Sequence, residues 1–555
     1  MAYRINENCV CCHYCRMECP VSAISYKGTR YAIDPEKCVS CGLCQTLCHV
    51  GAIINTEETA AVQPHAPALM QCDVVVVGSG GCGVTAAVRL AEGGKKVILV
   101  EAGKKLGGNT YLAHGTGFIG SKVQEKMGVP DESDRMLRRI LSKSLWKVDP
   151  KKLEENIHAS GGFFDWFAEQ EGALEPFVYN EKGWMKFDYP YRRDHNLKCR
   201  DQAIGPGWMG SFFIDKLLER GKQYDLTVLT GCRAKRLLTD GDRVTGIVCQ
   251  DDGGEVRIEG RDCVLATGGF LANREMMQAH FPWFYEGEEP VHQFNVPTNV
   301  GDGHLMVEQI GGQVDYDSVD VNLGGPAHHP YGYCAYRIMR QPEAVYVNMD
   351  GHRFMDETGG LNDGKYLLRK QPGAISYCVL DEGLLTELGQ RLADNPPDVF
   401  DGWILKDFRE EIEEEIAGGY ASFKADTLEE LAEKIGMPPQ MLADEITKYN
   451  RFCQQGRDDD CYKDPKFLKP LGKGPYYAFY QKSFSEGTHG GIAIDADFRV
   501  LKANGSVIAG LWSGGDCART DMSKGYGPVG LNGGLGGAFA GGYKIALNIL
   551  QQSGK

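Results

Sequence analysis

The sequence predicts an α/β fold, and three neighbouring features carry this prediction. The apolar run Val74–Val77 is typical of a buried parallel strand. Glycines follow at G-x-G-x-x-G spacing, which permits a tight turn, close approach of backbone to a pyrophosphate, and packing of a helix on the strand. A helix over 84–92 and a strand over 96–100 come next, and the strand ends at Glu101, whose carboxylate can accept a ribose hydroxyl. The glycines are Gly78, Gly80 and Gly83. This order predicts a Rossmann-like dinucleotide-binding domain, although the glycine motif alone does not distinguish NAD from FAD.

Length and composition restrict the broad class of the protein. A chain of 555 residues is expected to form roughly two to four domains. The net charge of -15 argues against nucleic acid as a partner. The chain has no run of 18 apolar residues and no apolar signal region near its N-terminus, so we expect no membrane span. Of the 20 cysteines, eight follow a metal-binding pattern, which indicates a reducing, cytoplasmic compartment.

Two four-cysteine runs near the N-terminus predict an electron-transfer module. Each run has the spacing C-x2-C-x2-C-x3-C, and this internal repeat resembles the bacterial two-cluster ferredoxin. Thiolates at this spacing wrap a 4Fe–4S cube, and the fourth cysteine of each run ligates the other cluster. We therefore assign one cluster to Cys9, Cys12, Cys15 and Cys48, and the other to Cys19, Cys38, Cys41 and Cys44. A zinc site is the weaker alternative because zinc sites rarely use two interleaved runs. His49 stands where proline is usual, and Cys11 lies outside the pattern as a packed or exposed free thiol.

The residues after Glu101 indicate FAD as the cofactor. Gly107-Gly108-Asn109-Thr110 follows this acid after a short spacer, and here the chain resembles the FAD-dependent superfamily of fumarate reductase flavoproteins, urocanate reductases and 3-ketosteroid Δ1-dehydrogenases. The resemblance implies that this loop passes beside the flavin. It extends to an ATGG segment, a GDG turn and a closing strand that ends in Gly-Gly-Asp, although each glycine run alone would more often be a plain turn. The implied FAD-binding residues are Gly78, Gly80, Gly81, Gly83, Glu101, Ala102, Gly108, Asn109, Thr110, Ala266, Thr267, Gly268, Asp302, Gly515, Asp516 and Gly530.

Hydrophobic periodicity predicts the remaining elements in order. We expect two helices over 134–149 and 151–172, and a glycine loop over 205–221 that leads into an amphipathic helix. Three short strands with turns are expected over 226–239, 240–250 and 255–266. Further along the chain, 427–454 is strongly amphipathic.

The middle of the chain lacks a second nucleotide fingerprint and is predicted to be α+β. By the resemblance it is a cap inserted into the Rossmann-like domain, closing over the flavin and holding the substrate. The stretch Val347–Glu357 matches the VN-x-x-G-x-RF-x-x-E pattern of the family, and we expect Arg353 and Glu357 to be mainly structural. The predicted division is a small α+β ferredoxin-like domain at 1–56, a linker at 57–71, the FAD-binding domain at 72–320 and 487–555, and the cap at 321–486.

The chain departs from fumarate reductases at the positions that handle a dicarboxylate. Where those enzymes have a proton-delivering arginine four residues after the glutamate, this chain has Leu361. Gly487 stands where a clamping histidine would be, and the run 530–537 lacks an arginine. Since a carboxylate in a dry pocket needs a cationic partner, the sequence argues against fumarate as the substrate.

Two groups of residues are candidates for catalysis. Tyr526 and Gly530 resemble the pair that polarises the substrate carbonyl in ketosteroid dehydrogenases, which is the physics of an oxyanion hole. Alternatively, the glycines only let a helix N-terminus approach the flavin while Tyr526 packs. The second group crowds a short span of the cap, where most members would be packing or surface residues and one, by preference a tyrosine, would transfer a proton. Its candidates are Tyr333, Tyr336 and Arg337, among His328, His329, Tyr331 and Arg340.

Together these features predict an FAD- and iron–sulfur-dependent oxidoreductase that reduces an activated C=C bond in an enone or enoate. Electrons would enter at two 4Fe–4S clusters and leave the flavin as a hydride. The donor would be reduced ferredoxin, flavodoxin or an NADH-oxidising protein. The alternatives are a ketone 1,2-dehydrogenase running the same chemistry in reverse, an electron-relay subunit and, third, a dicarboxylate reductase.

Overall fold

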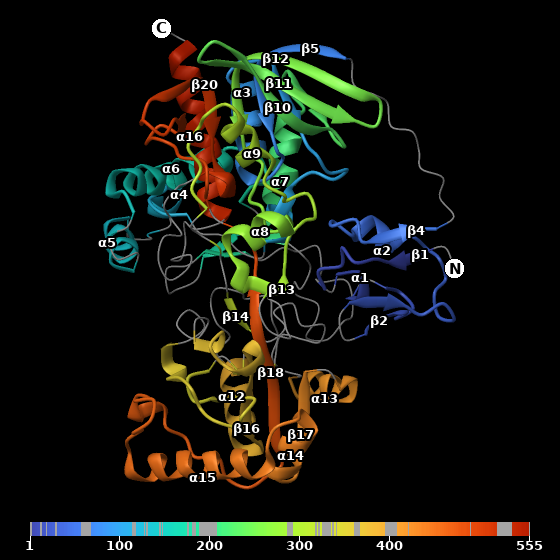
Figure 1. Ribbon diagram of the computed structural model, residues 1–555, viewed down its shortest axis with the longest axis vertical. Coiled ribbons are helices and arrows are strands. Elements are labelled where there is room, and N and C mark those ends of the chain that lie inside the picture. Colours follow the sequence, from blue (N-terminus) through green and yellow to red (C-terminus); the bar gives the residue numbers. More distant parts are fainter. Residues whose placement is uncertain are drawn as a thin grey trace.

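The computed structural model describes residues 3–553 apart from several gaps. The longer gaps are 57–67, 114–117, 180–184, 188–207, 286–291, 325–334, 360–366, 395–407 and 519–534, and shorter ones are 12–13, 18, 28–29, 127, 129–130, 132, 144–145, 147, 175–176, 317–318, 320–321, 336–337, 340, 420 and 489. The described chain forms a small N-terminal unit, a large unit around an eight-stranded sheet, and a second large unit around a six-stranded sheet (Figure 1). Within these residues, no helix is long and apolar enough to cross a membrane.

The N-terminal unit brings the two cysteine runs together. Its first strand pairs antiparallel with its last, so the two ends of the module lie side by side. Apolar side chains of Tyr3, Ile24, Tyr31 and Ile53 are buried among the cysteines. Its elements are β1 (Tyr3–Ile5), α1 (Tyr14–Met17), β2 (Ile24–Tyr26), β3 (Tyr31–Ile33), α2 (Leu43–Leu47) and β4 (Ile53–Asn55).

The eight-stranded sheet carries the predicted glycine motif. Its order is β10-β11-β20-β12-β5-β6-β9, with β19 paired to β20. The strands are β5 (Leu69–Val77), β6 (Val97–Val100), β9 (Leu226–Leu229), β10 (Arg233–Asp240), β11 (Arg243–Asp251), β12 (Gly254–Leu265), β19 (Arg499–Leu501) and β20 (Val507–Ser513). Val77 is in register with Val100 on one side and with Leu265 on the other, so these parallel strands end at one level. The predicted strands 74–77 and 96–100 are confirmed, and β5 starts earlier, at Leu69.

One predicted strand is wrong in detail. The segment 226–239 is two strands, β9 and β10, which are separated by a turn at Gly231 with φ of 65°. β9 pairs parallel with β6 at one edge of the sheet, whereas β10 pairs antiparallel with β11 at the opposite edge, so the chain crosses from one edge of the sheet to the other. β9 is mostly apolar, whereas β10 carries Arg233, Lys235 and Arg236, and the glycine between them marks the break.

Helices cover one face of this sheet and bury an aromatic core against it. The rings of Phe163 and Phe539 stack with centroids 4.9 Å apart, and Phe118 and Phe213 pack beside them. The helices of this unit are α3 (Gly81–Glu92), α4 (Lys122–Lys126), α5 (Ser133–Lys143), α6 (Pro150–Ala168), α7 (Trp208–Gly221), α8 (Arg274–His280), α9 (Asp302–Gln309) and α16 (Leu535–Ser553). A short hairpin is formed by β7 (Phe177–Tyr179) and β8 (Met185–Phe187).

The second large unit is built around β18, which in Figure 1 runs from it toward the eight-stranded sheet. The sheet order is β13-β18-β16-β15, and β14 and β17 also pair with β18. Its strands are β13 (His292–Gln293), β14 (Asn322–Gly324), β15 (Val345–Asn348), β16 (Ile375–Asp381), β17 (Ser422–Ala425) and β18 (Tyr476–Ser485). Its helices are α12 (Glu382–Asp394), α13 (Phe408–Gly418), α14 (Leu428–Ile435) and α15 (Pro439–Gln455). The amphipathic stretch 427–454 is thus two helices, divided at Gly436 and the prolines that follow it.

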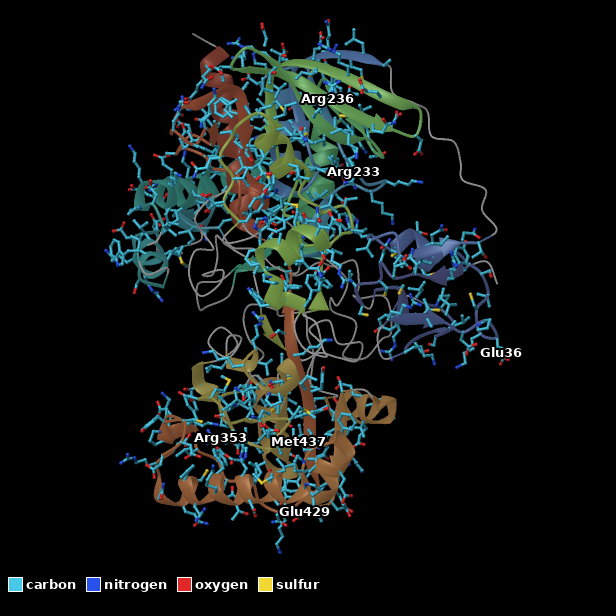
Figure 2. The ribbon with its side chains drawn as sticks, in the orientation of Figure 1. Glu36, Arg233, Arg236, Arg353, Glu429 and Met437 are labelled. Atoms are coloured by element: carbon cyan, nitrogen blue, oxygen red, sulfur yellow. The ribbon has the colours of Figure 1, made fainter. Side chains whose placement is uncertain are left out.

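A buried network of charges lies in this second unit around Arg353, which is labelled in Figure 2. Arg353 Nη2 donates to Glu357 Oε2 at 3.0 Å and to Asp458 Oδ2 at 2.9 Å. Lys463 Nζ lies 3.3 Å from Glu357 Oε2, and all four side chains are fully buried. Two cations therefore face two carboxylates. This network ties the turn after β15 to the segment after α15, far from the eight-stranded sheet, which agrees with a structural role for Arg353 and Glu357.

Candidate cofactor sites

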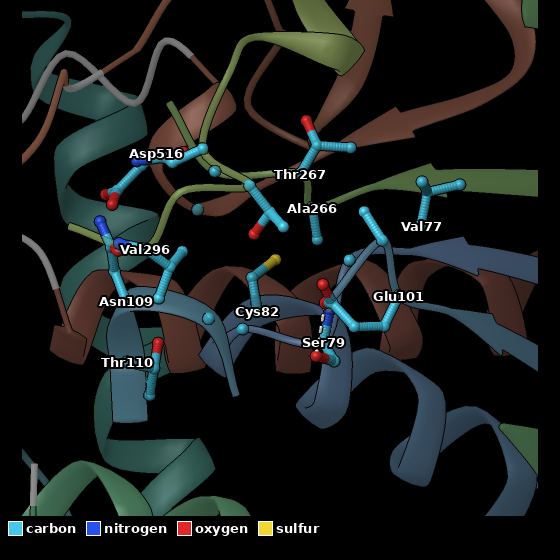
Figure 3. A pocket seen from close by; sticks show the side chains of 18 of the residues that line it. Val77, Ser79, Cys82, Glu101, Asn109, Thr110, Ala266, Thr267, Val296 and Asp516 are labelled. Atoms are coloured by element: carbon cyan, nitrogen blue, oxygen red, sulfur yellow. Dashed lines mark hydrogen bonds between the residues drawn. The ribbon is translucent and has the colours of Figure 1, made fainter. Parts of the chain in front are cut away.

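A cleft lies where the parallel strands of the eight-stranded sheet end (Figure 3). It encloses about 760 Å³ of space, including the solvent at its mouth. The predicted FAD residues that line it are Gly78, Gly80, Gly81, Glu101, Ala102, Gly108, Asn109, Thr110, Ala266, Thr267, Gly268, Asp302, Gly515 and Asp516. Gly83 lies behind the cleft, and Gly530 lies outside the described residues.

The glycine motif works by close approach of backbone to backbone. Gly78 has φ of 99°, and a Cβ there would lie 2.2 Å from the carbonyl oxygen of Ala266. A Cβ on Gly83 would lie 1.8 Å from the carbonyl oxygen of Gly78, so only glycine lets α3 pack against this turn. The residue that caps α3 is Gly80, which offers no side-chain acceptor to the first N–H groups of the helix. A helix start of this kind is suited to bind a pyrophosphate.

Glu101 fixes the glycine turn against the end of β6. Its Oε2 accepts hydrogen bonds from Ser79 N at 3.0 Å and Ser79 Oγ at 2.6 Å, and its Oε1 accepts one from Gly103 N at 2.6 Å. An ionised carboxylate has about four acceptor sites, so one remains for a ribose hydroxyl. The carboxylate is buried and lines the cleft, as a ribose-binding acid requires.

Asn299 shows that the cleft is built for a polar ligand. This side chain is 4% exposed, and within the described chain neither its oxygen nor its nitrogen has a hydrogen-bond partner. It lines the cleft beside Gly268. A buried amide without partners costs free energy, which a polar group in the cleft would recover. The residues therefore fit an FAD molecule. The sequence analysis did not identify Asn299 or Ser79. Asn299 is marked in the sequence only by its proximity to the turn at Gly301–Gly303, and Ser79 only by its place inside the glycine motif.

Two other predicted residues are also held by protein contacts. Asn109 Oδ1 accepts a hydrogen bond from Val296 N at 2.8 Å, and its Nδ2 donates to the carbonyl oxygen of Glu486 at 3.2 Å. Asp302 accepts a hydrogen bond from Arg233 Nη1 at 2.8 Å. Burial raises the pKa of Asp302, and the guanidinium of Arg233 opposes this shift. Asn109 thus joins the cleft to the segments that follow β13 and β18, two neighbouring parallel strands of the six-stranded sheet.

The cysteines of the N-terminal unit surround a second, smaller cavity. Cys19, Cys38, Cys41 and Cys44 line a space of about 340 Å³, which is the set predicted for one cluster. Among the described residues, no three Cys, His, Asp or Glu side chains meet closely enough to hold a single ion. Two sulfurs of this set accept backbone hydrogen bonds: Cys19 Sγ from Ala23 N at 3.3 Å and Cys38 Sγ from Ser40 N at 3.4 Å. Such N–H···S bonds suit thiolates of an iron–sulfur cluster.

The other cysteine set is described in part. Cys9, Cys15 and Cys48 lie within the N-terminal unit, and Cys48 Sγ accepts a hydrogen bond from Ala52 N at 3.1 Å. Cys12 lies outside the described residues. Cys11, which the spacing leaves out, is buried in the core of the module, as expected of a packed thiol.

The predicted catalytic residues lie outside the part of the chain that the structure describes. They are Tyr333, Tyr336, Arg337, Tyr526 and Gly530, and the same holds for Leu361.

Comparison with known families and proteins agrees with the geometry of both sites. The family described as FAD binding domain matches residues 73–534, and the family described as 4Fe-4S binding domain matches residues 31–54. A vinyl phenol reductase of Lactiplantibacillus plantarum is 27% identical over 82% of this chain and 92% of its own length. An NADH:acrylate oxidoreductase of Vibrio harveyi is 27% identical over 80% of this chain, which spans only 47% of that relative. A 4-oxocyclohexanecarboxylate 2-dehydrogenase of Sinomonas cyclohexanicum is 26% identical over 87% of this chain and 93% of its own length.

Solved structures show the same fold. A flavocytochrome c3 fumarate reductase in an open conformation superposes with a TM-score of 0.66 at 24% identity, covering 87% of this chain and 79% of that one.

Proposed function

The chain belongs to the FAD binding domain family of flavoproteins, and from this membership we propose that it is an oxidoreductase that reduces an activated C=C bond of an unsaturated carbonyl compound. The observation that carries the proposal is the cleft at the strand ends, with its glycine turn, its buried acid Glu101 and its unpartnered amide Asn299, in a chain whose relatives include reductases of vinyl phenols and acrylate. When bound, FAD supplies two electrons as a hydride, and iron–sulfur clusters supply electrons one at a time.

Different residues of the chain would bind different parts of the cofactors. The N-terminus of α3 and the turn at Gly78 hold the pyrophosphate, and Glu101 holds a ribose. Asn299 donates or accepts a hydrogen bond inside the cleft. The eight cysteines hold two 4Fe–4S clusters, one on Cys9, Cys12, Cys15 and Cys48 and one on Cys19, Cys38, Cys41 and Cys44.

The substrate would be held by the proposed cap, 321–486, and by the return segment, 487–555. Tyr526 and the N–H of Gly530 would donate hydrogen bonds to the carbonyl oxygen of the substrate, where negative charge develops. A side chain among Tyr333, Tyr336 and Arg337 would protonate the α-carbon. The external electron donor would be reduced ferredoxin, flavodoxin or an NADH-oxidising protein. We also propose that residues 1–56 form the ferredoxin-like domain, residues 57–71 the linker and residues 72–320 the first part of the FAD-binding domain.

An anaerobic reoxidation assay tests this function. The purified holoprotein is reduced chemically and mixed with neutral enones, aryl acrylates or dicarboxylates, while flavin absorbance is followed. We expect fast reoxidation by neutral enones, with slower reaction in Tyr526→Phe and unchanged reaction in Tyr462→Phe, which alters an exposed tyrosine. Fast reoxidation by carboxylates would assign the carbonyl-binding role to a cationic residue such as Arg337 instead. No reoxidation by any compound would refute the reductase.

The reverse reaction is the second candidate, because the 4-oxocyclohexanecarboxylate dehydrogenase matches nearly its whole length. In that case the oxidised protein would bleach on mixing with saturated cyclic ketones. Comparing bleaching by ketones with reoxidation by enones in one preparation separates the two directions.

A further inference from the structure

The N-terminal unit contacts the large nucleotide-binding unit through a shared apolar cluster. Cys9 and Cys48 pack against this cluster, whereas the cavity of the other cysteine set lies elsewhere in the module. Val296 belongs to the cluster and also lines the cleft at the strand ends, so this one side chain lies between the module and the cleft. The cluster consists of Val10, Val50 and Ala52 from the N-terminal module and of Leu112, Phe294 and Val296 from the rest of the chain.

Polar and aromatic contacts fix the same interface. Lys105 Nζ donates to the carbonyl oxygens of Thr46 at 2.7 Å and Cys48 at 2.9 Å. The ring of His49 stacks on Tyr111 with centroids 4.2 Å apart and planes 7° apart. Lys105 and Tyr111 flank the loop Gly108–Thr110, which lines the cleft.

The opposite side of the module faces solvent. Cys41 is exposed, and Val39, which lines the same cavity, is 62% exposed. The two cysteine sets are therefore not equivalent: one packs toward the cleft and one faces outward.

We propose that the module is docked with Cys9 and Cys48, two of the cysteines assigned to one cluster, toward the FAD cleft and with the site of Cys19, Cys38, Cys41 and Cys44 toward solvent, and that Lys105 and His49 are the positioning residues for this order. The inference rests on the proposed function in requiring both cluster sites to be loaded. Proline, which usually follows the fourth cysteine of such a run, has no aromatic ring to stack on Tyr111, so the presence of His49 in its place acquires a role.

The ammonium of Lys105 provides a test that is selective for one site. Reduction adds negative charge to a cluster, and a cation beside Cys48 favours that form. In a redox titration followed by electron paramagnetic resonance, Lys105→Met is expected to shift the midpoint potential of one cluster to a more negative value and leave the other unchanged. Lys105→Arg is expected to restore it, and Lys104→Met, which removes the same charge one residue earlier, to shift it less. Cys41→Ser is expected to alter the signal of the cluster that faces solvent. This variant therefore identifies the cluster whose midpoint potential should not change in Lys105→Met.

The stacking contact between His49 and Tyr111 is tested by a separate measurement. Hydrogen exchange of the backbone amides over 105–112 is expected to be faster in His49→Ala and close to that of the unmodified chain in His49→Phe, which keeps the stack on Tyr111. A shift of the outward cluster in Lys105→Met, equal shifts of both clusters, or no shift would overturn the proposed order. Unchanged exchange in His49→Ala would overturn the role of His49. These outcomes are independent of substrate, so they differ from a failure of flavin reoxidation by enones.

Discussion

Replacing Glu101 by glutamine is expected to weaken FAD binding strongly. The carboxylate accepts three hydrogen bonds, two from Ser79 and one from Gly103 N. The glutamine amide keeps one acceptor oxygen, which serves Ser79 best, and it then points its NH2 at the N–H of Gly103. The carboxylate site left for the ribose hydroxyl belongs to the same group, so this hydrogen bond loses its charge assistance or its acceptor, at about 1.5–3 kcal/mol. Because the bonds to Ser79 and Gly103 exist with and without FAD, this ribose contact sets the change of the dissociation constant, which should rise by roughly 10–150-fold.

The assay is titration of deflavinated protein with FAD, followed by quenching of flavin fluorescence. Glu259→Gln is the matched control, because Glu259 is an exposed glutamate on β12 that makes hydrogen bonds with Gln71 and Arg257 away from the cleft. Circular dichroism verifies that both variants fold. The reasoning is refuted if Glu101→Gln folds normally and binds FAD as tightly as the unmodified chain.

Three further perturbations follow from the structure. Glu357→Gln should lower the stability of the second large unit by about 3–5 kcal/mol, since it leaves buried cations without a charged partner; unfolding in urea measures this, and an unchanged midpoint would contradict it. Gly83→Ala should abolish FAD retention on gel filtration, because its Cβ would meet the Gly78 carbonyl; a yellow, monodisperse variant would show the contact to be dispensable. Burial is the largest influence on the pKa of Glu343 and raises it, but the hydrogen bonds and charge of Arg391, a backbone hydrogen bond and the charge of Lys463 together lower the net pKa. A lowered folded-state pKa stabilises the protein above the unfolded-state value and the gain is lost as pH falls, so the decrease in Tm caused by Arg391→Leu should be largest near neutral pH and should shrink below about pH 4. A decrease independent of pH would rule out this linkage.

Local sequence was sufficient for the parts of this protein that are governed by local constraints. The strand before Gly78, the helix after it and the strand that ends next to Glu101 are confirmed, because a pyrophosphate turn restricts residue type over a short span. The role of Glu101 in holding a ribose stays a proposal. The family match over 73–534 confirms the FAD-binding flavoprotein, and the match over 31–54 confirms a 4Fe-4S binding region. The catalytic roles of Tyr526 and its companions stay predictions.

Short-range patterns also have a limit, which the break between β9 and β10 illustrates. β9 is mostly apolar and β10 begins with several basic residues, but neither composition identifies their partners, β6 and β11, which lie in different parts of the chain. Strand pairing is a long-range property, so the sequence of 226–239 does not contain it.

Sequence alone defines which chemistry the chain can hold, because it identifies an FAD-binding domain that begins at the glycine turn and a 4Fe-4S binding region among the N-terminal cysteines. Which side chains complete these sites depends on the tertiary structure. Asn299 has no motif, and its importance comes from being buried without a partner in the cleft. Lys105 is an ordinary basic residue until folding places its ammonium on the carbonyl of Cys48, 57 residues away in sequence. Contacts of this kind depend on the packing of whole units. They form only after the chain between the two residues has closed into a loop, and the entropy cost of that closure is not visible in a local stretch of sequence.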